Sequence, residues 1–167
     1  MDLATAASVV SAAAILFGLV FAGWQLRALG QQRAHEAQLQ LIQSFQTADF
    51  ARAVAYLIEL PDGLSYAEIK ARMGDEAFLF LEFAFALEGI GVLVARRELS
   101  LQLVEATYSG PYIIGWRKLR RYVEDMRAMT GTQTPLEYFQ WTAERLADRR
   151  AITPPEPAYL ALKDWKA

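Results

Sequence analysis

The sequence lacks the residues on which several classes of chemistry depend. It contains no cysteine and a single histidine, His35. Disulfides, thiolate nucleophiles and Cys-ligated zinc or iron–sulfur sites are therefore excluded, as is any metal site that needs two histidines. Glycine-rich phosphate loops and nucleophile elbows are also absent. These absences predict a protein that is not an enzyme and binds no metal or cofactor; the enzymatic alternative would have to use carboxylates, Lys, Tyr or Ser alone.

A large charge of one sign is lacking too. The net charge is −2 over 167 residues, so no overall field attracts nucleic acid, and no nucleic-acid reader motif is present. The sequence predicts no nucleic-acid partner, and no small-molecule substrate is evident. What it has in excess is apolar residues, which make up 54% of the chain and gather in two runs, residues 3–26 and 77–95.

The first apolar run has the properties of a membrane anchor. Residues 3–26 include no charged side chain. About 24 helical residues span about 36 Å, enough to cross a hydrocarbon core of about 30 Å. A cleaved signal peptide, the alternative, begins with a basic segment, whereas only Met1 and Asp2 precede this run. We therefore predict an uncleaved transmembrane helix with Trp24 near one membrane interface.

The charges that flank this run predict its orientation. Arg27 and Arg33 follow it, and no Lys or Arg precedes it. By the positive-inside rule the N-terminus lies outside and the rest of the chain lies in the cytoplasm. We expect a single-pass protein of a bacterial inner membrane, with Arg27 and Arg33 at the membrane surface or against a partner.

Small residues recur along the predicted anchor at a spacing of four. Such a stripe lets a second helix approach closely, although a run rich in alanine produces similar patterns by chance. The predicted partners are other transmembrane subunits and the lipid bilayer. The predicted packing residues are Ala14, Gly18, Ala22 and Trp24.

The rest of the chain reads as helical. No stretch alternates polar and apolar residues with a period of two, so we predict an all-α protein whose N-terminal transmembrane helix extends into a cytoplasmic bundle of about five further helices. The predicted segments are an anchor at 1–26, a juxtamembrane helix at 27–48, a bundle at 49–150 and a proline-rich tail at 151–167. The first expected helix covers 49–60 with Asp49 as N-cap, and a short helix follows that begins with a Ser65–Glu68 capping box and ends near Gly74. The next helix covers 75–97, and a further short helix is capped by Ser100. A helix then begins at Pro111 and runs to about Met129, and the last covers 135–149 with Thr134 as N-cap.

The second apolar run, residues 77–95, admits two interpretations. Two glutamates, Glu82 and Glu88, offset the gain from its apolar side chains, so insertion into a membrane is close to neutral. A second span would also carry Arg96 and Arg97 outward, against the positive-inside rule. We predict that the run is the central helix of the bundle and that Glu82 and Glu88 are buried structural charges. Their expected partners are Arg117, Arg120, Arg121 and Arg127.

Two further groups of side chains are candidates for contact with a membrane surface or a partner. Four cations, Arg117, Lys118, Arg120 and Arg121, lie within five residues. The alternative for them is a solvated face paired with nearby acids. The tail carries Tyr159 and Trp165, which either dock on a partner or pack on the chain's own bundle.

Parts of the sequence resemble a known group of proteins. Phe83 and the segments LEGIGVLV at 87–94 and GPYIIGWRKLRRYVEDMR at 110–127 resemble a family of uncharacterised bacterial single-span proteins described as a domain of unknown function. The resemblance implies an anchored helical domain and no particular reaction. The chain departs from the family pattern at Arg97-Glu98, where a turn glycine is expected. The matching positions are Glu88, Gly91 and Trp116.

Taken together, these features predict a non-enzymatic accessory subunit of a larger bacterial inner-membrane complex, of the kind found in energy-transducing and photosynthetic assemblies. The alternative is a membrane-anchored sensor or effector whose cytoplasmic helical domain changes partner in response to a signal.

Overall fold

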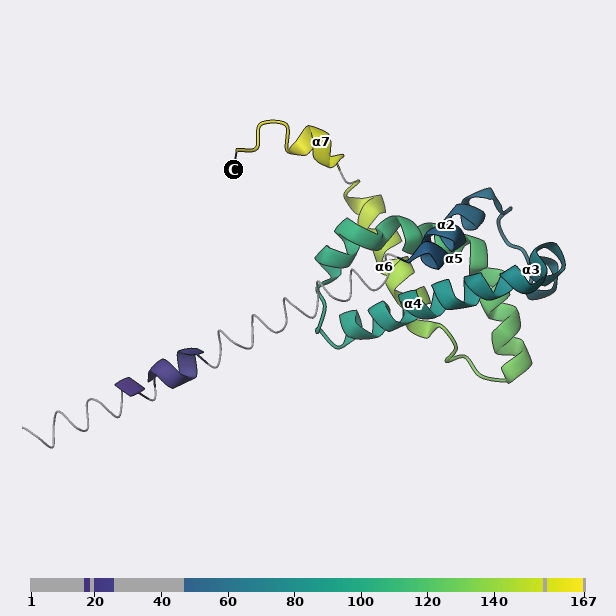
Figure 1. The fold of residues 1–167 in the computed structure, drawn as a ribbon, viewed down its shortest axis with the longest axis horizontal. Coiled ribbons are helices and arrows are strands. Elements are labelled where there is room, and N and C mark those ends of the chain that lie inside the picture. The colour runs from purple at the N-terminus through teal and green to yellow at the C-terminus, as the bar shows by residue number, and fades with distance from the viewer. Residues whose placement is uncertain (1–16, 19, 26–46, 155, 167) are drawn as a thin grey trace, which may run out of the picture. The chain divides into compact units, whose positions relative to one another are not determined.

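The computed structural model describes residues 17, 18, 20–25, 47–154 and 156–166 (Figure 1). The chain divides into two compact units, residues 1–44 and 45–167. In the first unit, the described residues 17, 18 and 20–25 are helical. The rest of the predicted anchor and most of the predicted juxtamembrane helix, including Arg27 and Arg33, lie outside the described residues.

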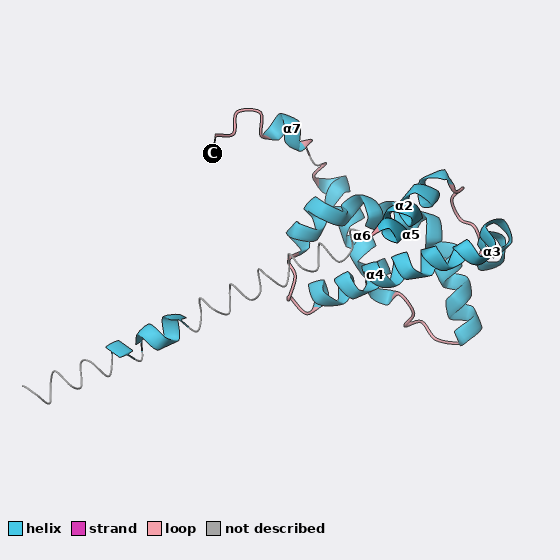
Figure 2. Cartoon of the chain, in the orientation of Figure 1, coloured by secondary structure: helices cyan, strands magenta, loops and turns pink. Residues whose placement is uncertain are grey.

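The second unit is built from helices. Throughout the described part of the chain no strand occurs, and loops join one helix to the next (Figure 2). The all-α prediction is therefore confirmed for these residues. The elements are α2 (Ala48–Glu59), α3 (Tyr66–Met73), the short 3-10 helix η1 (Gly74–Ala77), α4 (Phe78–Ala95), α5 (Leu101–Thr130), α6 (Glu137–Ile152) and the four-residue α7 (Ala158–Ala161).

Local capping sets the beginnings of the first two of these helices. The predicted box is present at α3, where the Ser65 side chain accepts from the Glu68 N–H and the Glu68 carboxylate accepts from the Ser65 N–H. The N-cap predicted for α2 is wrong by two residues. Thr47 caps this helix by accepting from the Phe50 N–H at 3.1 Å, and Asp49 lies in the first turn. A threonine hydroxyl satisfies an unpaired N–H as an aspartate would.

Helix α4 is the centre of the bundle. It packs most extensively on α6 and also on α2 and α5 (Figure 1). Seven of its residues are buried, among them Phe83, Leu87 and Ile90. The predicted start of this helix at Asp75 falls instead in η1, because Gly74 ends α3 with a φ of 56°. Among the described residues, one helical stretch, Tyr66–Ala95, is long and apolar enough to cross a membrane on length and composition alone.

The predicted helix boundary at Pro111 is wrong. Helix α5 runs without interruption for 30 residues, with Pro111 in its interior and Ser100 as its N-cap. An interior proline removes one backbone hydrogen bond and costs about 3 kcal/mol. Residues on both sides of it, including Val104 and Tyr112, are buried, and α5 packs along α6. This packing on both sides of Pro111 outweighs the local preference to break.

The predicted start of the last long helix is also wrong. Thr134 does not cap it; α6 begins at Glu137, after Leu136, which has a left-handed backbone with a φ of 59°. A leucine rarely adopts this conformation, but here its side chain is fully buried and its carbonyl accepts from Arg127. Tertiary contacts therefore fix where α6 begins.

Candidate functional site: the Glu88 junction and the exposed surfaces

The three positions that carry the family resemblance meet at the first turn of α6. The Glu88 carboxylate accepts from the Phe139 N–H at 2.6 Å. A Cβ added at Gly91 would lie 2.6 Å from the Tyr138 carbonyl oxygen, so the backbones of α4 and α6 touch there. The Trp116 ring stands edge-on to Phe139, with centroids 5.7 Å apart. We call this cluster of Glu88, Gly91, Trp116 and the α6 start the Glu88 junction.

The Glu88 side chain of α4 caps the N-terminus of another helix, α6. The first N–H groups of a helix have no intrahelical partner, and the helix dipole favours a negative charge beside them. Burial raises the pKa of Glu88, and the N–H groups of Phe139 and Tyr138 lower it in part. Burial is the larger cause, so this carboxyl is easier to protonate than a free one. Its role here is to join α4 to α6.

The sequence predicted burial for both glutamates of α4, and the structure places them differently. Glu88 is half-buried, whereas Glu82 is exposed to solvent on the outer side of α4. Glu82 lies six residues before Glu88, which places it on another side of the helix. The expected arginine partners are also wrong for Glu88, because its hydrogen bond comes from the backbone of α6 and Arg127 acts on it only through its charge.

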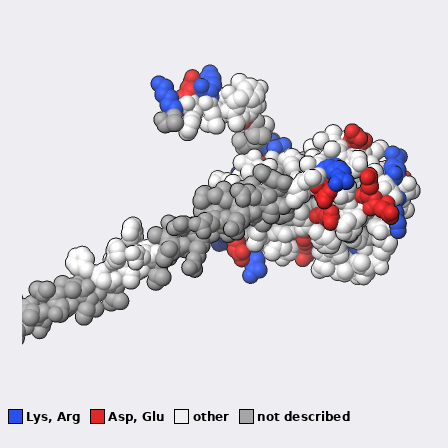
Figure 3. All heavy atoms as spheres, viewed as in Figure 1, with Lys and Arg blue, Asp and Glu red and all other residues white. Residues whose placement is uncertain are grey.

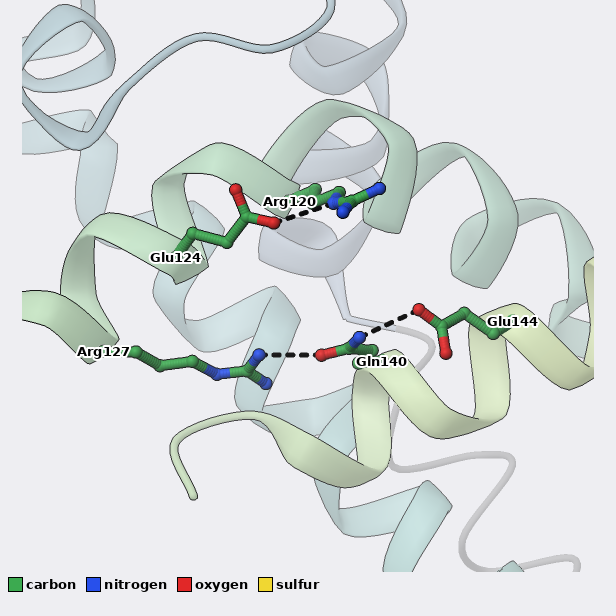
Figure 4. A network of polar contacts seen from close by, with 5 residues as sticks. All are labelled: Arg120, Glu124, Arg127, Gln140 and Glu144. Carbon is green, nitrogen blue, oxygen red and sulfur yellow. Dashed lines mark hydrogen bonds and ion pairs between the residues drawn. The ribbon is translucent and has the colours of Figure 1, made fainter. Parts of the chain in front are cut away.

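Arg127 itself holds the loop before α6. Its guanidinium is buried and donates to the carbonyls of Pro135 and Leu136 and to the Gln140 side chain at 2.7 Å. Gln140 donates onward to Glu144 at 2.8 Å (Figure 4). A buried arginine is stable only when its donors are satisfied, and these contacts satisfy several of them. The sequence singled out Arg127 as a partner for a glutamate, but its contacts are mainly to backbone.

A buried tyrosine completes the interior beside this junction. The Tyr112 hydroxyl donates to the Leu87 carbonyl at 2.6 Å. Burial raises its pKa strongly, and the nearby Thr142 hydroxyl lowers it in part. A phenol that stays protonated and donates to a helix carbonyl stabilises the fold and offers no base or nucleophile. The sequence analysis assigned no role to Tyr112 or Thr142.

Two of the four clustered cations of α5 bind the turn after α2. Arg117 lies 3.3 Å from the Asp62 carboxylate, and the Lys118 ammonium lies 2.7 Å from the same group. Lys118 also donates to the Leu60 carbonyl, and its residue is only 9% exposed. Lys118 is therefore not the surface contact that the sequence predicted. It joins α5 to the turn at 60–62, a role that the sequence did not predict.

The other two cations remain at the surface. Arg120 pairs with Glu124 at 2.8 Å, one turn along α5 (Figure 4). Arg121 is exposed. The pKa of Glu68 is lowered mainly by the hydrogen bonds from Ser65, and the charge of Arg121 lowers it further to a smaller extent. Blue and red side chains lie close together on the face of the bundle shown in Figure 3. Three of the four cations are therefore paired with carboxylates, Arg117 and Lys118 with Asp62 and Arg120 with Glu124.

Apolar side chains near the N-terminus are strongly exposed. In the first unit, Phe17, Val20, Phe21 and Trp24 are 79%, 72%, 56% and 67% exposed. Phe21 and Trp24 contact each other, with ring centroids 6.2 Å apart. Gly18 has nothing within 4 Å of an added Cβ, and Ala22 is exposed. Ala14, the remaining member of the predicted packing stripe, lies outside the described residues.

The tail is exposed as well. α6 ends at Ile152, and the tail then forms only the single turn of α7. Tyr159 and Trp165 are 77% and 72% exposed, so these aromatics do not pack on the bundle. Of the two interpretations of the tail, the structure disfavours packing on the chain's own core.

Metal ligands do not gather in the described residues, where no group of three His, Asp or Glu side chains is placed to hold an ion. Most of the polar contacts described above join one helix to another or lie within a helix or its cap. In the described ranges, the surfaces left over are the exposed apolar residues of the first unit, the outer side of α4, the tail and a groove beside α3.

Comparison with known proteins places most of the chain in a family of unknown function. A family model described as "Domain of unknown function (DUF4760)" matches residues 12–146. No curated protein and no solved structure matches the chain. The matched range includes the whole Glu88 junction and stops before the end of α6, so the tail lies beyond it.

Proposed function

We propose that this chain, which belongs to the DUF4760 family, is a non-enzymatic accessory subunit anchored in a bacterial inner membrane, where its helical bundle and tail dock on a larger membrane complex. The observation that carries the proposal is the exposed apolar helix in the first unit. Four large apolar side chains more than half exposed within eight residues are costly in water and favourable in lipid.

The anchor is tested by changing that helix. The double variant Phe17→Arg, Val20→Arg places two charges in the membrane interior, at a cost of about 5–7 kcal/mol. This cost opposes the insertion free energy that the apolar side chains of residues 3–26 provide. The full-length variant should leave the membrane fraction, as carbonate washing and immunoblotting would show. The matched control is Ile58→Arg with Ile152→Arg, two similarly exposed residues of the second unit, which should stay in the membrane pellet. If the two double variants fractionate alike, the N-terminal anchor is wrong.

The topology is tested by reporters fused after Ala167. One N-terminal span with a cytoplasmic bundle predicts fluorescent green fluorescent protein and inactive alkaline phosphatase at that position. If α4 also crossed the membrane, the phosphatase would be exported and active. An active phosphatase would therefore reject both the single span and a cytoplasmic docking role.

The accessory role is tested by purification from native membranes in mild detergent with mass spectrometry. We expect stoichiometric recovery of other transmembrane subunits. The variant Tyr159→Ala, Trp165→Ala should lose part of this complex, whereas Lys163→Ala, Lys166→Ala should retain it, because aromatic anchors contribute most to docking. Recovery of the native chain as a lone monomer would reject the proposal.

A further inference from the structure

A groove beside α3 has features that the docking role does not use. Its cavity of about 200 Å³ opens to solvent where α3, η1 and the start of α4 approach α5. Its apolar lining includes Tyr66, Phe78, Leu81 and Tyr122, and its polar lining includes Lys70 and Asp75. We call this cavity the α3 groove.

The aromatic wall of the α3 groove is held in place before any ligand arrives. The rings of Tyr66 and Tyr122 stack with centroids 5.0 Å apart and planes 26° apart. The Tyr66 N–H also donates to the Asp125 carboxylate at 2.9 Å, which ties the start of α3 to α5. Phe78 is 60% exposed, so one aromatic ring of the lining faces solvent. A preformed wall lowers the entropy cost of binding a flat or apolar group.

The two charged residues of the groove have opposite sign and are not used by the fold. Both Lys70 and Asp75 are exposed, and within the described residues neither forms an ion pair or a side-chain hydrogen bond. The contrast is with Asp62 and Lys118, which pair with each other at 2.7 Å. A cation and an anion beside one apolar wall complement a ligand that carries a carboxylate, an ammonium and an apolar group.

The size of the cavity limits that ligand. Pockets for drug-sized molecules usually measure about 300–1,000 Å³, and this groove is smaller. We propose that the α3 groove binds a free α-amino acid with an aromatic or large aliphatic side chain. Lys70 binds its carboxylate, Asp75 binds its ammonium, and the side chain lies against Phe78, Leu81 and the tyrosine pair. This assignment is independent of the docking role and would add ligand sensing to it.

The test is ligand-observed nuclear magnetic resonance and calorimetry on the full chain in mild detergent. L-phenylalanine is the probe, with 3-phenylpropanoate, phenethylamine and glycine as analogues that lack the ammonium, the carboxylate or the side chain. We expect L-phenylalanine to saturate with a dissociation constant on the order of 1 mM, as suits so small a ligand, and each analogue to bind at least tenfold more weakly. No saturation by L-phenylalanine at tens of millimolar, or equal binding of 3-phenylpropanoate or phenethylamine, overturns the assignment.

Matched variants locate the site. Lys70→Met and Asp75→Asn change exposed residues and should leave the fold intact while weakening L-phenylalanine at least tenfold. Leu81→Trp fills the groove and should abolish binding. The same changes in the tail, Lys163→Met and Asp164→Asn, are the controls and should bind as the native chain does. Unchanged binding by Lys70→Met and Asp75→Asn overturns the proposal, and this result does not depend on Leu81→Trp folding.

Discussion

Two carboxylates join helices in this bundle, and they do so by different means. Glu88 lies half-buried between α4 and α6 and accepts from backbone N–H groups, while Asp62 lies in an exposed turn and pairs with Lys118 and Arg117 of α5. Burial raises the pKa of Glu88, whereas the hydrogen bond from Lys118 lowers the pKa of Asp62. The interior contact depends on close packing and a helix terminus; the surface contact depends on charge.

The closest packing occurs at the Glu88 junction, so the largest effect is expected there. In Gly91→Ala the added Cβ would meet the Tyr138 carbonyl, a backbone atom that cannot move without moving α6. We expect a loss of about 3 kcal/mol in the free energy of unfolding, measured by urea denaturation of the full chain in mild detergent. Gly89→Ala, on the same helix but with nothing within 4 Å, should instead gain about 0.5–1 kcal/mol. Equal effects would refute the close approach of α4 and α6.

Removing the interior carboxylate should have the next largest effect. Glu88→Ala leaves the Phe139 N–H without its partner at a half-buried helix start, at a cost of about 2 kcal/mol. Glu82→Ala removes the exposed glutamate of the same helix and should change stability by less than about 0.5 kcal/mol. The measurement is the same urea titration. A similar loss in both variants would mean that net charge matters here and the cap does not.

At the surface junction, Lys118 should matter more than Arg117. Lys118→Met keeps the length of a buried side chain but removes the donor to the Leu60 carbonyl and leaves Asp62 paired only with the exposed Arg117, which should cost about 1–2 kcal/mol. Arg117→Met removes only an exposed pair and should cost about 0–0.5 kcal/mol. Thermal unfolding followed by circular dichroism would separate them, and the reverse order would contradict the burial of Lys118.

A smaller gain is expected after α4, where the chain departs from the family pattern. Arg97 has a left-handed backbone with a φ of 61°, and the following N–H groups of Glu98 and Leu99 both donate to the Leu93 carbonyl. Glycine adopts this conformation without strain, so Arg97→Gly should raise stability by about 0.5–1 kcal/mol. Arg96→Gly, with an ordinary helical backbone, should instead lower it. A loss in Arg97→Gly would show that no strain is stored at this turn.

The smallest expected effect is on pH dependence, and the two carboxylates should differ in its sign. A raised folded-state pKa means that the native state takes up the proton first, so the Glu88 contribution to stability improves as pH falls from the raised pKa toward the ordinary one. The lowered pKa of Asp62 gives stability that is present above the ordinary pKa and is lost as pH falls through the lowered value. The measurement is the free energy of unfolding of the native chain, Glu88→Gln and Asp62→Asn between pH 3 and 7. The difference between each variant and the native chain gives the contribution of that carboxylate to the pH dependence. Shifts of the same sign for both would contradict the difference in environment.

The helical class, the capping box at α3 and a helix with buried residues over most of 77–95 could be predicted without the structure. The capping box depends on groups within a few residues, and the apolar run at 77–95 is continuous along the chain, so both can be recognised from neighbouring residues. The resemblance also singled out Glu88, Gly91 and Trp116 before their common location was known.

The remaining features depend on contacts between helices. Helix α5 continues through Pro111, α6 begins at Glu137 and Lys118 is buried. Each outcome depends on groups from another helix: packing on both sides of a proline, a glutamate of α4 at the N-terminus of α6, or an aspartate in the turn after α2. Some of these contacts join residues far apart in the chain, such as Glu88 and Phe139 at 51 positions, and no local preference encodes them.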